Sequence, residues 1–250
     1  MKNGYLVFLD SGIGGMTTMH AVMKRIPDER YAYFCDSKNV PYGNKSDAEI
    51  LEHTSQMMER IARYPVKAVI MACNTITAVC GKTFRTEYPY KIFGIEPALR
   101  PALLHGGKTL VLATTRTVLG MEKGGFSAVA DLCALPFLAE EIERAKNPMA
   151  MDICSHLPPN CGYQNVVLGC THYPLVVRQI ARQYVGARIW DGNEGLAKNV
   201  ANWVLGNADR KESDANTPQN IDFSKIKLMF EKDDENRLKS QFYRFFVQKN

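Results

Sequence analysis

The chain has 250 residues, of which 46% are hydrophobic, and a formal net charge of +5. This length suits one large α/β domain or two smaller ones, and the composition is that of a globular protein. No stretch approaches the ~18 uninterrupted apolar residues that span a bilayer, the first twelve residues lack the apolar core of a signal peptide, and the lysines and arginines are scattered rather than clustered. We therefore expect a cytoplasmic protein without a membrane or nucleic-acid partner, and a homodimer stays open.

The seven cysteines indicate neither a metal site nor a disulfide framework. They form no C-x-x-C pair, and no histidine stands near them at zinc-finger spacing. Without a secretion signal the expected environment is reducing, so most of these thiols should be small buried side chains. The cysteines are Cys35, Cys73, Cys80, Cys133, Cys154, Cys161 and Cys170.

Short apolar runs alternate with helical patterns along the chain. The first run, Tyr5–Leu9, is continuous, as in a parallel strand covered on both faces. Further strands are expected over Tyr31–Phe34, Val66–Met71, Ile92–Ile95, Thr109–Ala113, Leu132–Leu135, Val166–Leu168, Ala187–Trp190 and Ile226–Phe230. Helices are expected over Met16–Arg25, Ser46–Arg63, Ala139–Ala145, Leu175–Tyr184, Leu196–Leu205 and Asp234–Phe246. Ser46 and Glu49 have the spacing of a capping box at the start of the second helix.

This alternation predicts an α/β fold with parallel sheets, in which ligands bind beyond the carboxyl ends of the strands. Polar clusters follow the strands at those ends. They are Asp10-Ser11-Gly12, Pro41-Tyr42-Gly43, Ala72-Cys73-Asn74-Thr75, Ala113-Thr114-Thr115 and Gly169-Cys170-Thr171-His172. The polar segment Asn207–Asn220 is interpreted as a linker, after which the strand over Ile226–Phe230 is expected to rejoin the first sheet.

Cys73 and Cys170 are the strongest candidates for chemistry, because each directly follows an apolar strand. Polar pairs follow both, Asn74-Thr75 in one half and Thr171-His172 in the other. The similar surroundings indicate a pseudo-twofold arrangement in which two thiols face each other across a cleft. One thiolate could then remove a proton from a carbon while the other thiol supplied one to its opposite face. The alternative is that both are packed core thiols.

Two further clusters could support such a site. Asp10 ends the first strand, and the turn at Gly12, Gly14 and Gly15 offers backbone N–H groups that can hold an anion at a helix N-terminus. The turn lacks the last glycine of a dinucleotide-binding fingerprint. His172, two residues after Cys170, could tune that thiol or donate a proton itself.

Together these motifs resemble the glutamate racemases of the aspartate/glutamate racemase superfamily. The resemblance rests on Leu9–Gly15, Asp36 with Pro41–Gly43, Ala72–Thr75, Gly94–Pro97 and Leu168–Leu175, which occur in the family's order. It implies two similar α/β domains with parallel-sheet cores and a pseudo-twofold inter-domain active-site cleft, the first from 1–92 with 206–250 and the second from 93–205. It also implies racemisation of L-glutamate to D-glutamate without pyridoxal phosphate or metal, which would supply D-glutamate for peptidoglycan.

The resemblance also implies roles for single residues. Cys73 and Cys170 would be the acid/base pair, with Asp10 assisting Cys73 and His172 assisting Cys170. The substrate's carboxylates and amine would be held by residues of the strand-end clusters. These are Asp10, Ser11, Tyr42, Gly43, Asn74, Thr75, Thr115, Thr171 and His172.

A glutamate downstream of Cys133 would complete the family's site, which points to Glu141, or to Glu140 one residue earlier. Two alternatives stay open. The first is a two-cysteine enzyme that acts on aspartate or another acidic amino acid, which the pocket near Thr115 and Thr171 would decide. The second is a homologue that binds a ligand without turnover, against which the presence of both cysteines argues.

Overall fold

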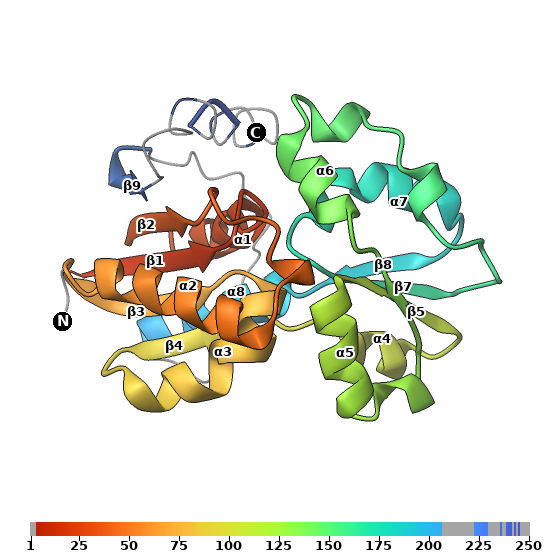
Figure 1. Cartoon of the computed structure of the whole chain (residues 1–250), viewed down its shortest axis with the longest axis horizontal. Coiled ribbons are helices and arrows are strands. Elements are labelled where there is room, and N and C mark those ends of the chain that lie inside the picture. The colour runs from red at the N-terminus through yellow and green to blue at the C-terminus, as the bar shows by residue number, and fades with distance from the viewer. Residues whose placement is uncertain are drawn as a thin grey trace.

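The computed structural model describes residues 4–206, 223–229 and, nearer the C-terminus, residues 236, 239–241, 243 and 245. Its strands form two separate sheets in which every pairing is parallel (Figure 1). The first sheet has the order β4-β3-β1-β2-β9, with β1 Tyr5–Asp10, β2 Arg30–Cys35, β3 Val66–Met71, β4 Lys91–Gly94 and β9 Ile226–Met229. The second has the order β6-β5-β7-β8, with β5 Thr109–Ala113, β6 Asp131–Ala134, β7 Asn165–Gly169 and β8 Arg188–Asp191. The prediction of an α/β fold with parallel sheets is confirmed.

The two sheets repeat one strand order. When the strands of each sheet are counted along the chain, both sheets run second, first, third, fourth, and β9 extends the first sheet beside β2. The pairing of Ile226 with Tyr31 confirms that the C-terminal strand rejoins the first sheet. In each sheet the direction of the strand order reverses between the first and third strands, and ligands of such folds bind at this switch point.

Helices cover both faces of each sheet. They are α1 Met16–Arg25, α2 Asp47–Ile61, α3 Asn74–Glu87, α4 Leu99–His105, α5 Thr115–Lys123, α6 Leu138–Arg144, α7 Val177–Gln183 and α8 Asn193–Leu205. Successive strand residues point to opposite faces, so Leu6 and Phe8 pack under α1 and α8, whereas Val7 and Leu9 pack under α2 and α3. In the second sheet α6 and α7 cover one face and α4 and α5 the other.

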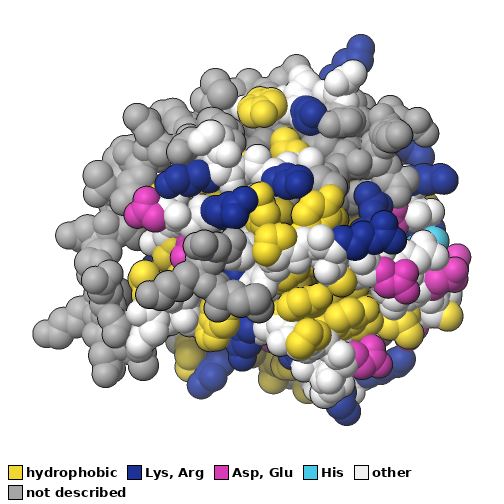
Figure 2. All heavy atoms as spheres, turned by 90° about the vertical axis from the view of Figure 1, so that its left-hand side faces the viewer, with side chains coloured by type: hydrophobic (Ala, Val, Ile, Leu, Met, Phe, Trp, Pro, Cys, Tyr) yellow, Lys and Arg dark blue, Asp and Glu magenta, His cyan; other side chains and the backbone are white. Residues whose placement is uncertain are grey.

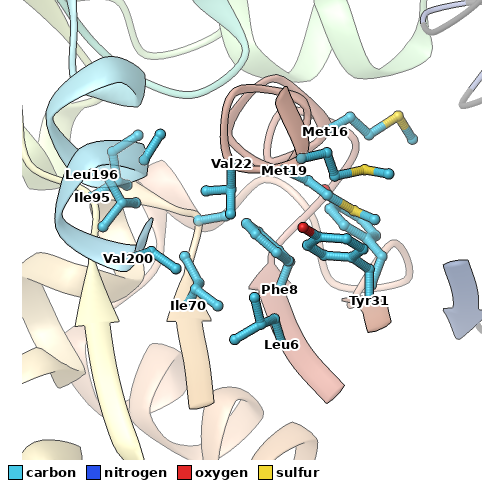
Figure 3. Close-up of a cluster of buried hydrophobic side chains, with 14 of the residues drawn as sticks. Leu6, Phe8, Met16, Met19, Val22, Tyr31, Ile70, Ile95, Leu196 and Val200 are labelled. Atoms are coloured by element: carbon cyan, nitrogen blue, oxygen red, sulfur yellow. The ribbon is translucent and has the colours of Figure 1, made fainter. Parts of the chain in front are cut away.

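The helix α8 follows the last strand of the second sheet but packs on the first. Its Leu196 lies in the same buried cluster as Val22 of α1 (Figure 3). The expected second domain included this helix. The packing instead supports a first domain of residues 4–95 with 193–206 and 223–229, and a second of 96–192, and we propose these boundaries.

Most expected elements are present, with differences at their ends. The capping box is confirmed, because the Glu49 N–H donates to Ser46 Oγ (3.3 Å) and the Ser46 N–H to Glu49 Oε2 (2.8 Å). The helix expected over Leu175–Tyr184 begins as a 3-10 helix over Tyr173–Val176 and continues as α7. Pro174 lies in its first turn, where the missing N–H is tolerated. The expected linker and most of the last expected helix lie outside the described residues.

The end of the first sheet at which its strands begin lies at the left of Figure 1 and faces the viewer in Figure 2, where hydrophobic side chains lie beside lysines and arginines. Arg30 lies over the ring of Tyr5, 4.2 Å from its centroid, and Lys227 over that of Tyr64 at 4.5 Å. Such contacts contribute about 0.5–1 kcal/mol each at exposed sites.

In the described part of the chain, no helix has the length and apolarity to cross a membrane.

Candidate active site

Four strands from the two switch points end around one cavity. β1 ends at Asp10, β3 leads into Cys73, β5 into Thr114 and β7 into Cys170. The cavity is lined from both domains. Its lining consists of Ser11, Val40, Pro41, Tyr42, Gly43, Cys73, Asn74, Thr75, Thr114, Pro136, Ala139, Cys170, Thr171 and His172. The two cysteines therefore occupy similar positions, each one or two residues after the third strand of its sheet.

Cys73 is a buried thiol at the N-terminus of α3. Its Sγ lies 3.7 Å from the hydroxyl of Ser11. Burial raises the pKa of Cys73 well above its usual value, and the nearby charge of Asp10 raises it further, while the N–H of Ile76 partly offsets both effects. Cys73 is therefore a thiol that keeps its proton at neutral pH.

Asp10 is fully buried beside this thiol. Burial raises the pKa of Asp10 to about 6, although the charge of His172 and the N–H of Gly15 act in the opposite direction. The Gly15 N–H donates to Oδ2 at 2.6 Å, and the hydroxyl of Tyr33 lies 3.3 Å from the same oxygen. Within the described residues, Oδ1 has no hydrogen-bond partner. One carboxyl oxygen is thus held by the protein while the other stays available.

Cys170 is flanked by a different group, a buried histidine–glutamate pair. His172 Nδ1 lies 3.8 Å from Cys170 Sγ, and His172 Nε2 lies 2.8 Å from Glu143 Oε2. Burial lowers the pKa of His172, but hydrogen bonds to Cys170 and Glu143 and their negative charges outweigh it, so this pKa lies well above its usual value. The result is an imidazolium held next to the second thiol.

The glutamate of this pair is Glu143, whereas the sequence pointed to Glu141 or Glu140. Glu141 is 45% exposed and pairs with His156, and Glu140 pairs with Arg144 on the surface. The reason is helix geometry: each residue turns by about 100°, so residues 141 and 143 point about 200° apart. The face of α6 that is turned toward the site therefore carries Glu143, whose side chain is 1% exposed. Nothing in the sequence of this acidic run distinguishes Glu143 from its neighbours.

The structure brings most of the other expected residues to the cavity. Ser11, Tyr42, Gly43, Asn74, Thr75, Thr171 and His172 all line it. Thr115 does not: its hydroxyl lies 3.4 Å from Asn44 Oδ1, outside the cavity. Its neighbour Thr114 lines the cavity instead. The Thr114 hydroxyl lies 3.0 Å from that of Thr75 and also caps the N-terminus of α5. A Thr between a strand and a helix, where Thr is a favoured N-cap residue, is the signal that could have identified it.

The glycine turn presses directly against the loop that carries Cys170. A Cβ on Gly12 would lie 2.3 Å from Glu143 Oε2, and one on Gly14 would lie 2.7 Å from the backbone nitrogen of His172. The turn was expected to offer N–H groups to an anion. The N–H groups of the turn instead bind carboxylates of the protein itself: that of Ile13 donates to Glu143 (2.8 Å) and that of Gly15 donates to Asp10.

Two helices begin at the cavity, α3 after Cys73 and α5 after Thr114. The N-terminus of a helix carries partial positive charge and free N–H groups, which suit a carboxylate. Asn74 Nδ2 is a buried donor that has no partner within the described residues. The lining therefore offers donors that suit carboxylate groups, on a surface to which both thiols contribute.

The family model for Asp/Glu/hydantoin racemases matches residues 16–200 of the chain. The chain belongs to this family. It is 33% identical over 211 residues to a glutamate racemase of Leptospira borgpetersenii serovar Hardjo-bovis, a match that covers 78% of this chain and 80% of the relative. It is 32% identical over 240 residues to a glutamate racemase of Clostridium perfringens, covering 89% and 90%.

Solved structures of glutamate racemases show the same fold as this family member. The Campylobacter jejuni structure superposes with a TM-score of 0.74 at 20% identity and covers 95% of this chain and 96% of its own. The Escherichia coli structure, solved with L-glutamate and the activator UDP-MurNAc-Ala, gives 0.72 at 24% identity and covers 96% and 95%.

We expect Glu143→Gln to lower racemase turnover by about tenfold or more, because a neutral amide does not stabilise the His172 imidazolium beside Cys170. Glu141→Gln, on the surface of the same helix, is the matched control and should change turnover by less than about twofold. Turnover is measured with thermal melts of both variants. Equal losses in the two variants would contradict the role of Glu143.

The raised pKa of Asp10 predicts a pH-dependent stability effect in this racemase. Since the pKa rises from 3.8 to about 6 on folding, the folded state binds the proton more tightly, and stability is lost as pH rises between these values. The loss reaches about 3 kcal/mol above pH 6. Asp10→Asn removes the charge, so its free energy of unfolding relative to wild type should rise by about that amount from about pH 4 to about pH 7. Urea unfolding at several pH values measures it, and a difference that does not vary with pH would contradict the burial argument.

Proposed function

We propose that this chain is a glutamate racemase that interconverts L- and D-glutamate by a two-base mechanism, with Cys73 and Cys170 as the acid/base pair. The observation that carries the proposal is that these two buried thiols sit at equivalent strand ends of the two sheets and line one cavity. Each also has its own assisting group, Asp10 on one side and the Glu143–His172 pair on the other.

The reaction exchanges one proton on each side of the α-carbon. In the resting enzyme Cys73 keeps its proton, because burial and Asp10 raise its pKa, which leaves Cys170 beside the His172 imidazolium as the base. The Cys170 thiolate takes the α-proton, the electron pair stays on the α-carbon, and the Cys73 thiol donates a proton to the opposite face. The product then leaves with inverted configuration, and the thiol and thiolate have exchanged places.

The α-proton of an amino acid is far less acidic than a thiol, so the carbanion needs stabilisation. Donors already fixed around a closed cavity supply it without reorganisation. Asn74, Thr75, Thr114 and Thr171 line the cavity as such donors, and the N-termini of α3 and α5 act on the carboxylates of the substrate. The mechanism we propose therefore needs neither pyridoxal phosphate nor a metal ion.

The choice of glutamate among acidic amino acids rests on the relatives. Those at 32–33% identity are named glutamate racemases, whereas the two helix N-termini of the cavity suit either dicarboxylate. A cytoplasmic enzyme of this kind would supply D-glutamate for peptidoglycan. Aspartate is the alternative substrate, and a parallel assay distinguishes the two.

Turnover of L-glutamate in D₂O tests the two-base proposal. Because the donating thiol exchanges with solvent, newly formed D-glutamate should carry deuterium at the α-carbon while the remaining L-glutamate keeps its hydrogen early in the reaction. Cys73→Ser and Cys170→Ser should each lower racemisation by about a hundredfold or more. Chiral separation followed by ¹H NMR measures both quantities.

Cys80→Ser is the control for this experiment, since Cys80 is another fully buried thiol of α3 that does not line the cavity. It should racemise glutamate at close to the wild-type rate. Deuterium that enters L-glutamate as fast as D-glutamate, or wild-type racemisation by either active-site variant, would show that a single base does the work.

A further inference from the structure

Tyr33 lies behind the glycine turn, at a point where the surroundings of the two thiols meet. It is the fourth residue of β2 and is fully buried. Its hydroxyl donates to the carbonyl oxygen of Gly12 at 2.7 Å and lies 3.3 Å from Asp10 Oδ2. A single hydroxyl therefore contacts both the carboxyl beside Cys73 and the backbone of the turn.

The Gly12 carbonyl that accepts from Tyr33 belongs to a peptide group that makes a second hydrogen bond. This peptide joins Gly12 to Ile13, and its N–H donates to Glu143 Oε2 at 2.8 Å. Glu143 in turn holds His172 at 2.8 Å, and His172 lies 3.8 Å from Cys170. A hydrogen bond to the carbonyl side of a peptide polarises it and strengthens donation from its N–H side. Tyr33 is thus connected to the second thiol through one peptide plane.

We propose that Tyr33 is a positioning residue for both thiols: its hydroxyl orients Asp10 beside Cys73 and, through the peptide between Gly12 and Ile13, the Glu143–His172 pair beside Cys170. The proposal rests on the proposed two-base function. It explains why Asp10 is held at Oδ2 alone, since the Gly15 N–H and the Tyr33 hydroxyl both meet that oxygen.

The simpler reading is that Tyr33 is a buried tyrosine whose hydroxyl merely satisfies a carbonyl, and the chain contains a control for it. Tyr31, two residues earlier on the same face of β2, is also fully buried in the same core cluster. Its hydroxyl donates to the carbonyl of Ile26 at the end of α1, away from the cavity. Tyr31→Phe and Tyr33→Phe therefore remove the same atom from similar surroundings, and only the second removes it from the site.

The first measurement compares racemisation by these two variants. Tyr33→Phe should lower kcat by about tenfold with KM within about twofold, because the groups that move protons are displaced while those that bind carboxylates are not. The loss should be seen from either enantiomer, since the hydroxyl serves both thiols. Tyr31→Phe should keep the wild-type kcat, although both variants should melt at similarly lowered temperatures.

The second measurement does not depend on turnover. The carboxyl carbon of Asp10 is followed by ¹³C NMR through a pH titration, with Asp10→Asn used to assign the signal. The charged and titratable groups that face Asp10 are His172, Glu143, Cys73 and Tyr33. The one proton of the Tyr33 hydroxyl is shared between the Gly12 carbonyl at 2.7 Å and Asp10 Oδ2 at 3.3 Å. Loss of its donation to the carboxylate should raise the midpoint in Tyr33→Phe, whereas Tyr31→Phe should leave it at the wild-type value.

The two measurements separate this inference from the proposed function. A wild-type protein that does not racemise glutamate would contradict the proposed function. The titration would still decide whether the Tyr33 hydroxyl affects the titration midpoint of Asp10. A Tyr33→Phe variant with the kcat of Tyr31→Phe and an unchanged Asp10 midpoint would overturn the positioning role.

Discussion

A side chain at Gly14 would have no room, because its Cβ would lie 2.7 Å from both the backbone nitrogen and Nδ1 of His172. This close approach brings the turn after β1 of the first sheet against the loop after β7 of the second. It lets the Ile13 N–H reach Glu143 across the domain boundary. With a larger residue the loop carrying Cys170 would be displaced, so the distance between the two thiols depends on a residue that contributes no side chain.

The repeated strand order explains why two thiols meet at all. Each sheet has its switch point between its first and third strands, and a cysteine follows each third strand, Cys73 two residues after the end of β3 and Cys170 one residue after the end of β7. The two halves are not equal in chemistry, however. Burial and the nearby charge of Asp10 raise the pKa of Cys73, whereas an imidazolium stands beside Cys170. A two-base racemase needs such inequality, because one thiol must hold a proton while the other accepts one.

Much of this arrangement is predictable from the sequence, since apolar runs ending in polar clusters identify parallel strands and their ligand-binding ends. Cys73, Cys170, Asp10 and His172 are found in this way. Glu143 is not, because three acids within four residues of α6 differ only in helical phase, which depends on where the helix packs. The packing of α8 on the first sheet is likewise hidden, since its apolar pattern fits either core. Tertiary contacts decide both.

The central claim is that this chain inverts the α-carbon of glutamate with its own thiols, and circular dichroism tests it most directly. Purified protein, dialysed against a chelator and kept reduced without pyridoxal phosphate, is incubated with L-glutamate and, in parallel, with L-aspartate. The account predicts that the glutamate signal decays to zero and that the aspartate signal persists. A glutamate signal that persists under these conditions would contradict it.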